Sequence, residues 1–221
     1  MRRFLRNQGL TIVVLSTFLI LLVGQSIVGH LQHNEDLQQQ SQRSLSYPEY
    51  LVSSHFLEAT MENWESEFLQ MFAFVVLTAF LFLKGSIESK DPDKTAEVDR
   101  DPRKGKNRRN VPWPVRKGGI ILTLYEYSLS LAFLLMFLFS FGLHAVGGAG
   151  EYNREQRSLG KQEATVVEFM STSEFWFQSL QNWQSEFLAV GSMVLLSIWL
   201  RQRGSPESKP VDAPHAQTGK E

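Results

Sequence analysis

The chain contains one unusual heptapeptide twice, as NWESEFL at residues 63–69 and as NWQSEFL at residues 182–188. A shift of 119 residues relates the two, and the same shift aligns residues 55–90 with residues 174–209 without a gap. About 15 of these roughly 36 positions are identical, which is the signature of an internal repeat. The sequence therefore predicts two repeats at 1–90 and 120–209, a linker at 91–119 and a tail at 210–221.

The apolar residues gather into four blocks, at residues 10–28, 68–83, 129–146 and 187–200. The first and third blocks contain no charged side chain. They reach the roughly 18 to 20 residues that a helix needs to cross the hydrocarbon core of a bilayer. Both are therefore predicted to be transmembrane helices, although the nearly balanced charge of the whole chain would also suit one or two soluble domains.

The second and fourth blocks are shorter, at roughly 14 to 16 residues, a length that also fits a buried helix of a soluble protein. Each follows a segment that carries a Trp, and each ends in basic residues, Lys84 in one repeat and Arg201 and Arg203 in the other. Such side chains snorkel to the membrane interface, which restores a spanning length. The predicted spans are residues 10–30, 64–84, 124–147 and 180–201.

These features predict an all-α fold, an integral membrane four-helix bundle built from two tandem two-span repeats, with short external amphipathic helices. Those helices are expected to begin at two capping-box patterns, SYPE at residues 46–49 and TVVE at residues 165–168. The cytoplasmic linker and tail contain too few apolar residues to offset their conformational entropy, so both are expected to be disordered.

Basic residues indicate the orientation in the membrane. They precede the first span at Arg2, Arg3 and Arg6 and are dense in the linker, whereas the segment between the first two spans contains one, Arg43. By the positive-inside rule, both termini and the linker are cytoplasmic. A signal peptide is the alternative for the N-terminal run. We expect a retained helix, because the equivalent run of the second repeat lies deep inside the chain.

A basic cluster in the linker consists of Arg103, Lys104, Lys106, Arg108 and Arg109. We favour a solvated topology determinant, and contact with anionic lipid headgroups stays open. Nucleic-acid binding is not expected, because no aromatic residue is interleaved with the basic ones. The expected partners are the lipid bilayer and, as an open alternative, a second copy of the chain.

The repeated heptapeptide places polar residues on one face of a helix. Asn63, Ser66 and Glu67 follow one another at i, i+3 and i+4. The second repeat has the same stripe at Asn182, Ser185 and Glu186. Beside these stripes stand Trp64 and Trp183, which are predicted, together with Trp113 of the linker, to anchor the chain at the membrane interface.

A pseudo-twofold axis along the membrane normal would bring the two stripes face to face, with Glu67 opposite Glu186. Both glutamates are expected near the outer boundary of the bilayer, roughly 22 to 26 Å of helix before the basic residues that end their spans. We favour interhelical hydrogen bonds here, and an ion or proton site that includes Asn63 and Asn182 is the second interpretation. A catalytic carboxylate pair is the third, because no nucleophile, metal triad or phosphate loop accompanies it.

Cofactor chemistry has little support in the sequence. The chain has no cysteine, and the common nucleotide-binding, zinc-protease and hydrolase motifs do not occur in it. His30 and His144, near the outer ends of the first and third spans, would hold a haem only if packing brought them together, so ordinary interfacial histidines are favoured. No cofactor, no metal and no enzymatic activity are expected.

Three segments carry a resemblance to a known family: RRFLRNQGL near the N-terminus, HFLEATMENWESEFLQM at the first heptapeptide, and WLRQRGSPESK after the last span. The chain resembles, over nearly its whole length, bacterial four-span membrane proteins catalogued only as a domain of unknown function. The resemblance implies topology and bacterial origin but no activity. We therefore expect a non-enzymatic scaffold or envelope component, with a small ion or proton conduit as the alternative. Gln184, which stands where the first repeat has Glu65, indicates that the halves differ in function.

Overall fold

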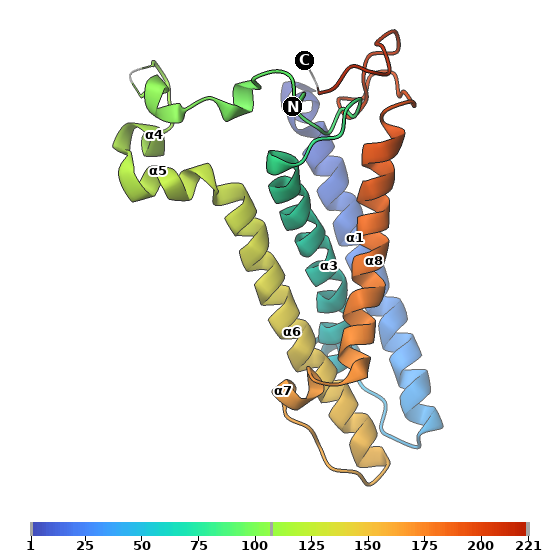
Figure 1. Cartoon of the computed structure of the whole chain (residues 1–221). Helices are drawn as coiled ribbons and strands as arrows, with labels where there is room; N and C mark the ends of the chain where they lie inside the picture. The colour runs from blue at the N-terminus through green and yellow to red at the C-terminus, as the bar shows by residue number, and fades with distance from the viewer. Residues whose placement is uncertain (1, 107, 220–221) are drawn as a thin grey trace. The chain divides into compact units, whose positions relative to one another are not determined.

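The computed structural model of the chain describes residues 2–106 and 108–219, and all regular structure in this part is helical. The four long helices in Figure 1 are α1 (Arg2–Gln39), α3 (Ser54–Phe80), α6 (Ser128–Ser158) and α8 (Ser173–Leu196). The short elements are α2 (Tyr47–Leu51), the 3-10 turns η1 (Glu97–Asp99) and η2 (Pro102–Gly105), α4 (Trp113–Lys117), α5 (Gly119–Glu126) and α7 (Val166–Phe169). The predicted all-α class is confirmed.

The chain divides into two compact units, each assembled from two stretches of sequence. Unit 1 comprises Met1–Met61 and Gly142–Phe175, and unit 2 comprises Glu62–Phe141 and Trp176–Glu221. Each unit therefore takes residues from both predicted repeats, and the division falls within the long helices α3, α6 and α8.

In unit 1, α2 and α7 begin at the two capping boxes that the sequence predicts. The backbone N–H of Ser46 donates to Glu49 Oε2 at 2.8 Å. The backbone N–H of Thr165 donates to Glu168 Oε2 at 2.7 Å. Hydrogen bonds to the ionised carboxylate lower the pKa of both glutamates. Both capping boxes are thus formed, as predicted.

The loop ahead of each capping box is held by one asparagine. Asn34 Oδ1 accepts a hydrogen bond from the backbone N–H of Leu45 at 2.7 Å, and its Nδ2 donates to the carbonyl oxygen of the same residue at 2.9 Å. Asn153 makes the same two bonds with Ala164, at 2.7 and 2.8 Å. The two loops therefore close with identical hydrogen bonds at an offset of 119 residues.

Aromatic rings fill the interior of unit 1 at positions that the shift of 119 residues relates. Tyr50 of α2 is buried and lies 5.5 Å, centroid to centroid, from the ring of Phe56. Phe169 of α7 is also buried and lies 5.6 Å from the ring of Phe175. Each short helix is thus fixed by an aromatic pair with the start of the long helix that follows it.

Glycines on α6 allow other elements of unit 1 to approach its backbone closely. A Cβ atom added to Gly147 would lie 2.6 Å from the backbone nitrogen of Glu58 on α3. One added to Gly148 would lie 2.5 Å from the ring of Phe169. Close approach of helices through small residues is typical of packing within membranes.

In unit 2, α3 and α8 are each followed by the same turn, with the sequence Gly-Ser-x-Glu-Ser-Lys. Ser89 Oγ accepts from the backbone N–H of Leu83 at 2.8 Å, and Ser208 Oγ accepts from that of Gln202 at 2.8 Å. The first glycine of each turn has a positive φ, 90° in one and 85° in the other, which glycine adopts without steric cost.

The C-terminal tail returns to the first of these turns through a buried lysine. Lys209 Nζ donates to the carbonyl oxygens of Gly85 at 2.7 Å, His215 at 2.8 Å and Gln217 at 3.1 Å. Burial lowers the pKa of this ammonium group. In the structure the tail forms turns, and the linker forms turns and short helices. The predicted disorder of both segments stays a prediction.

The two even-numbered predicted spans, 64–84 and 180–201, extend past the C-terminal ends of the helices that the structure contains. α3 ends at Phe80 and α8 at Leu196. The residues beyond belong to the turns described above, where Ser89 and Ser208 take backbone N–H groups out of the helical pattern.

The predicted span 124–147 is not one continuous helix, because the chain breaks at Tyr127 between α5 and α6. The hydroxyl of Ser128 donates to the carbonyl oxygen of Tyr125 at 2.9 Å, and the hydroxyl of Ser130 donates to that of Tyr127 at 3.0 Å. Serine hydroxyls bonded to preceding carbonyls compete with helical hydrogen bonds and bend helices. The helix of this span therefore begins at residue 128.

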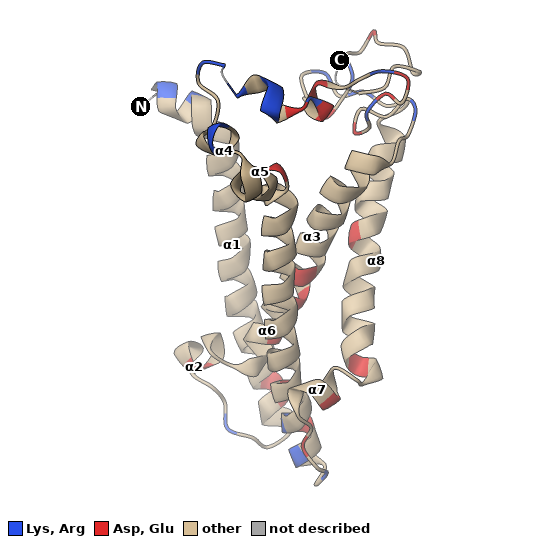
Figure 2. Cartoon of the chain, turned by 60° about the vertical axis from the view of Figure 1, so that its left-hand side comes forward, with Lys and Arg blue, Asp and Glu red and all other residues tan. Residues whose placement is uncertain are grey.

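Within the described residues, α1 and α6 are the two helices long and apolar enough to cross a membrane. Figure 2 shows both as uncharged ribbons over most of their length, whereas α3 and α8 carry acidic residues. The first and third predicted spans thus coincide with helices of membrane-spanning length, while α3 and α8 do not meet the same criterion of length and composition.

Candidate functional site

The candidate site lies in unit 2, where polar side chains of α3 meet α8. Glu62, Glu65 and Gln70 follow one another at i, i+3 and i+8, a spacing that places them on one face of the helix. The side chain of Glu65 is fully buried, and that of Gln70 is nearly so. A carboxylate within a predicted membrane span is costly unless it is hydrogen-bonded or protonated.

Three hydrogen bonds join this face of α3 to α8. Asn182 Nδ2 donates to Glu62 Oε1 at 2.5 Å. The indole Nε1–H of Trp183 donates to Glu65 Oε1 at 3.1 Å. Gln70 Nε2 donates to the backbone carbonyl oxygen of Glu186 at 3.0 Å. The α3–α8 contact therefore contains two carboxylate acceptors from α3 and two donors from α8.

Aromatic rings enclose the Trp183 indole that contacts Glu65. Its ring centroid lies 6.2 Å from that of Phe137, 6.4 Å from that of Phe141 and 6.2 Å from that of Trp176. The carboxylate that this indole contacts is itself fully buried. An ionised carboxylate in such surroundings depends on its donors, because little solvent is available to replace them.

The structure places the predicted polar stripe differently on the two helices. On α3, Asn63 and Glu67 are exposed, while Ser66 is buried and donates to the carbonyl oxygen of Asn63 within its own helix. On α8, Ser185 is exposed and makes the equivalent bond to Asn182. Asn182, one of the six predicted residues, donates a side-chain hydrogen bond to the other helix.

Glu67 and Glu186, predicted to face each other, both belong to unit 2. Glu67 is exposed and Glu186 is half-buried. Glu62 and Glu65 make the interhelical hydrogen bonds, and the facing of Glu67 and Glu186 stays a prediction.

Sequence reasoning missed Glu62 and Glu65 because it searched for residues that the two repeats share. The equivalent positions of the second repeat are Gln181 and Gln184, so neither carboxylate is repeated. Two identical acidic stripes would repel each other across a twofold axis, whereas a carboxylate acceptor opposite an amide or indole donor is complementary. The sequence difference between Glu65 and Gln184 was the signal that could have identified this carboxylate.

The tryptophans predicted as interface anchors have different surroundings. Trp64 is half-buried and its ring lies 6.4 Å from that of Phe68 on the same helix. Trp113 is exposed at the start of α4. Trp183 uses its indole N–H for Glu65. The basic cluster at Arg103–Arg109 is exposed where its side chains are described.

A second polar cluster, not predicted as a site, lies in unit 1. His33 is buried, its ring centroid is 4.4 Å from that of His55, and its Nδ1 makes no hydrogen bond. Tyr50 Oη lies 3.2 Å from His55 Nδ1. His33 stands in the polar end of α1, beyond the predicted span. Burial lowers the pKa of both histidines, because it disfavours the charged form of the ring.

The two histidines considered for haem have other partners. His30 Nε2 lies 2.8 Å from the carbonyl oxygen of Leu45, and the buried ring of His144 stacks on Phe175 at 4.9 Å. Among the residues that the structure describes, no group of three or more potential ligands could hold a metal ion.

This fold and site define an all-helical protein with two helices of membrane-spanning length and a polar, carboxylate-containing helix contact. The chain belongs to the family described as Domain of unknown function (DUF6766), whose model matches residues 1–220. No curated protein and no solved structure matches the chain.

Proposed function

We propose that the protein is a multi-pass integral membrane protein of the bacterial inner membrane, a non-enzymatic scaffold or envelope component with four spans. The observation that carries this proposal is the distribution of polarity along α1 and α6. Ile20 is 71% exposed and Leu135 is 66% exposed, whereas Ser140 and His144 are buried. Soluble proteins bury their large apolar side chains and expose polar ones. Exposed apolar helices require a hydrocarbon solvent.

The even-numbered helices fit the role of spans that pack through polar contacts. α3 has 27 residues and α8 has 24, or about 40 and 36 Å at 1.5 Å per residue, against a hydrocarbon core of about 30 Å. Their carboxylates lower their overall hydrophobicity, but Glu62 and Glu65 are hydrogen-bonded rather than free toward lipid. Interhelical hydrogen bonds of this kind stabilise membrane helices.

Duplication of a two-span unit explains the matching loops and turns. The asparagine bonds of the two loops and the serine bonds of the two turns recur at 119 residues. A unit with two spans returns to the side on which it began, so two such copies share one orientation and both termini are cytoplasmic. The basic residues of the linker, coloured blue in Figure 2, support this orientation.

Cysteine labelling tests the proposal directly, because the chain has no cysteine of its own. Single variants Ser44→Cys and Ser158→Cys probe the predicted external loops, and Val98→Cys and Val211→Cys probe the predicted cytoplasmic segments. The protein should stay in the membrane pellet at alkaline pH. A membrane-impermeant maleimide should label the first pair in intact spheroplasts and the second pair only after lysis. Release into the alkaline supernatant would remove the proposal.

A proton or cation conduit is the second candidate, and the complete burial of Glu65 favours it. An intramembrane carboxylate beside Glu62 and Asn182 is the kind of group that binds a proton or cation in transport. In proteoliposomes, Glu65→Gln should reduce proton or sodium flux at least tenfold if this carboxylate carries the ion. The matched comparison is the double variant Glu67→Gln with Glu186→Gln, two carboxylates that are not fully buried. Flux that is absent in the parent protein, or unchanged by Glu65→Gln, contradicts the conduit.

A further inference from the structure

The two short helices that lead into α6 expose large apolar side chains. In unit 2, Trp113 of α4 is 59% exposed and Ile120 of α5 is 80% exposed. Leu124, Tyr125 and Tyr127 are exposed as well. Large apolar side chains that gather on a surface mark a contact with another protein or with a membrane.

The spacing along α5 explains why these side chains share one face. Ile120, Leu124 and Tyr127 follow one another at i, i+4 and i+7, which is one side of a helix. Leu122 stands on the opposite side and is buried. α4 packs against α5, and its buried residue is Val115. The apolar face of α5 is therefore separate from the residues that the two helices bury.

Two glycines form the turn between α4 and α5. Gly118 has a φ of 72° and Gly119 a φ of 61°, values that glycine adopts without the Cβ clash of other residues. A Cβ atom added to either would meet nothing within 4 Å, so it is the backbone conformation that requires glycine here. Figure 1 shows that α5 turns away from the axis of α6.

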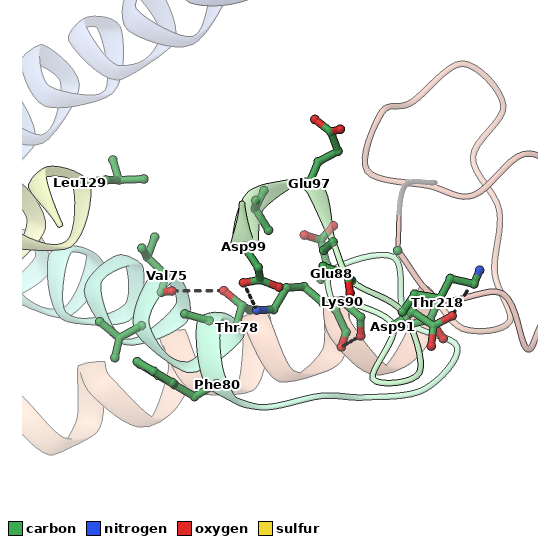
Figure 3. A pocket seen from close by; sticks show the side chains of 18 of the residues that line it. Val75, Thr78, Phe80, Glu88, Lys90, Asp91, Glu97, Asp99, Leu129 and Thr218 are labelled. Carbon is green, nitrogen blue, oxygen red and sulfur yellow. Dashed lines mark hydrogen bonds and ion pairs between the residues drawn. The ribbon is translucent and has the colours of Figure 1, made fainter. Parts of the chain in front are cut away.

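A pocket beside the break between α5 and α6 shows at which level of unit 2 this break lies. The pocket has a volume of about 810 Å³, and its lining includes Tyr127 at the break and Leu129 at the start of α6. Figure 3 shows that Phe80, the last residue of α3, lines the same pocket together with Lys90 and Asp91 of the following segment. The break thus lies where the apolar residues of α3 give way to charged ones. In a chain that spans a membrane, such a transition marks the boundary between hydrocarbon and headgroups.

Basic side chains accompany the apolar face. Residues 108–127 contain four basic residues and one acidic residue: Arg108, Arg109, Arg116, Lys117 and Glu126. The four basic residues are exposed. Arg116 and Lys117 follow Trp113 at i+3 and i+4, so they stand on the same side of α4 as its indole. Aromatic and basic side chains side by side are typical of segments at the cytoplasmic surface of a membrane.

We propose that α4 and α5 form a surface element that binds anionic phospholipids of the cytoplasmic leaflet, such as phosphatidylglycerol. The inference rests on the proposed membrane location. Arg116 and Lys117 donate to headgroup phosphates, while Trp113 and Ile120 enter the boundary between headgroups and acyl chains. α6 favours a bilayer over a protein as the occupant, because this helix of membrane-spanning length begins at Ser128, directly after the break. α5 is therefore tethered at the surface of the bilayer.

The test measures which lipid surrounds α5 in the full-length protein, reconstituted into nanodiscs of phosphatidylcholine and phosphatidylglycerol in equal amounts. Thr123 is an exposed polar residue of α5, so Thr123→Cys introduces the one cysteine of the chain without changing the apolar face. The cysteine carries a fluorescent nitrobenzoxadiazole probe, and a nitroxide near the headgroup end of an acyl chain is placed on either lipid. Both lipids should quench the probe.

The nitroxide on phosphatidylglycerol should quench the residue-123 probe about fivefold more strongly than the nitroxide on phosphatidylcholine. This is the factor expected for one basic residue at an anionic surface. The same probe at Val211→Cys, an exposed position of the tail, should be quenched by neither lipid.

Two double variants separate α4 from the general charge of the linker. Arg116→Gln with Lys117→Gln should bring the ratio of the two quenching constants close to one. Arg100→Gln with Arg103→Gln removes the same charge at side chains that pair with acids of the linker, and it should leave the ratio unchanged. An equal fall in both double variants would assign the lipid preference to the linker as a whole and overturn the role of α4.

Ile120→Gln with Leu124→Gln tests the apolar face and should weaken quenching by both lipids. Three further results would overturn the assignment: equal quenching by the two lipids in the parent chain, a ratio that survives Arg116→Gln with Lys117→Gln, or a residue-123 probe that neither lipid quenches. The last result in a chain that is dimeric in the nanodisc would indicate a second copy as the occupant of this face.

Alkaline extraction of membranes from the same cells separates this inference from the proposed function. A chain that stays in the pellet but gives one of the contrary results contradicts the surface element alone. A chain that is released, yet binds phosphatidylglycerol vesicles in preference to phosphatidylcholine vesicles through Arg116 and Lys117, contradicts the four spans alone. A released chain without that preference contradicts both.

Discussion

The indole nitrogen of Trp183 donates to the buried carboxylate of Glu65 across 3.1 Å, although 118 residues separate the two in the chain. The bond joins the two heptapeptides, but its acceptor is a residue that differs between the two repeats. In the first repeat the position after Trp64 is a glutamate, and in the second the position after Trp183 is Gln184. The duplicated sequence thus forms an asymmetric bond here, in which Glu65 of the first copy accepts and Trp183 of the second donates.

Trp183→Phe should destabilise unit 2 by about 1–3 kcal/mol, because a buried carboxylate loses a donor that water cannot replace. In the background of Glu65→Met, which removes the acceptor at similar volume, the same change should cost about 1–2 kcal/mol less. The double-mutant cycle is measured by thermal unfolding in detergent at pH 7.

Trp199→Phe is the matched control for that cycle, since Trp199 is exposed beyond the end of α8. This substitution should change the free energy of unfolding by no more than about 0.5 kcal/mol, whether residue 65 is Glu or Met. A coupling energy near zero between Trp183 and Glu65 would show that the hydrogen bond contributes no net stability.

Two glycines of α6 should respond to alanine in opposite directions. Gly147→Ala should destabilise the protein by about 1–3 kcal/mol, because the new Cβ would lie 2.6 Å from the backbone nitrogen of Glu58 and the helices would have to separate. Gly142→Ala meets nothing within 4 Å, so it should stabilise the helix by about 0.5–1 kcal/mol. Equal effects of the two substitutions in thermal unfolding would contradict the close approach of α3 and α6 in unit 1.

The stability of unit 1 should fall as the pH falls below about 6.5, the usual pKa of an unfolded histidine. Burial holds the pKa of His33 and His55 below that value, so the unfolded chain binds more protons than the folded one in this range. The contribution is fully present above the unfolded pKa and is lost as the pH falls toward the folded one. Of the nearby charges, Asp36 and Glu151 favour protonation of these histidines and Arg154 opposes it.

His33→Tyr should flatten this pH dependence, because Tyr152 occupies the equivalent position of the second repeat and does not ionise between pH 5 and 7. The comparison is the midpoint of thermal unfolding at pH 7.5 and pH 5.0 in the parent chain and the variant. The same loss of stability in both proteins would exclude His33 as its cause.

The repeat pattern predicted contacts well where both copies use the same local bonds. The capping boxes at Ser46 and Thr165 are confirmed, because a hydroxyl and a carboxylate three residues apart determine their own geometry. Long-range contacts were less predictable. Sequence spacing gives the face of a helix but not the rotation of that face toward a partner, so Glu62 and Glu65 were missed. The break at Tyr127 was also missed, because it depends on serine hydroxyls that compete locally.

Lys209→Met should release the C-terminal tail from unit 2. The buried ammonium group bridges the carbonyl oxygens of Gly85, Pro214, His215 and Gln217, and methionine offers no donor to replace it. The tail should then be cleaved at least tenfold faster by a nonspecific protease between residues 210 and 219. Lys90→Met is the matched control, because Lys90 holds the same place in the first turn but pairs with Asp99 of the linker. It should accelerate cleavage near η1 and leave the tail intact, whereas equal rates in the parent and Lys209→Met would contradict the role of the carbonyl cluster.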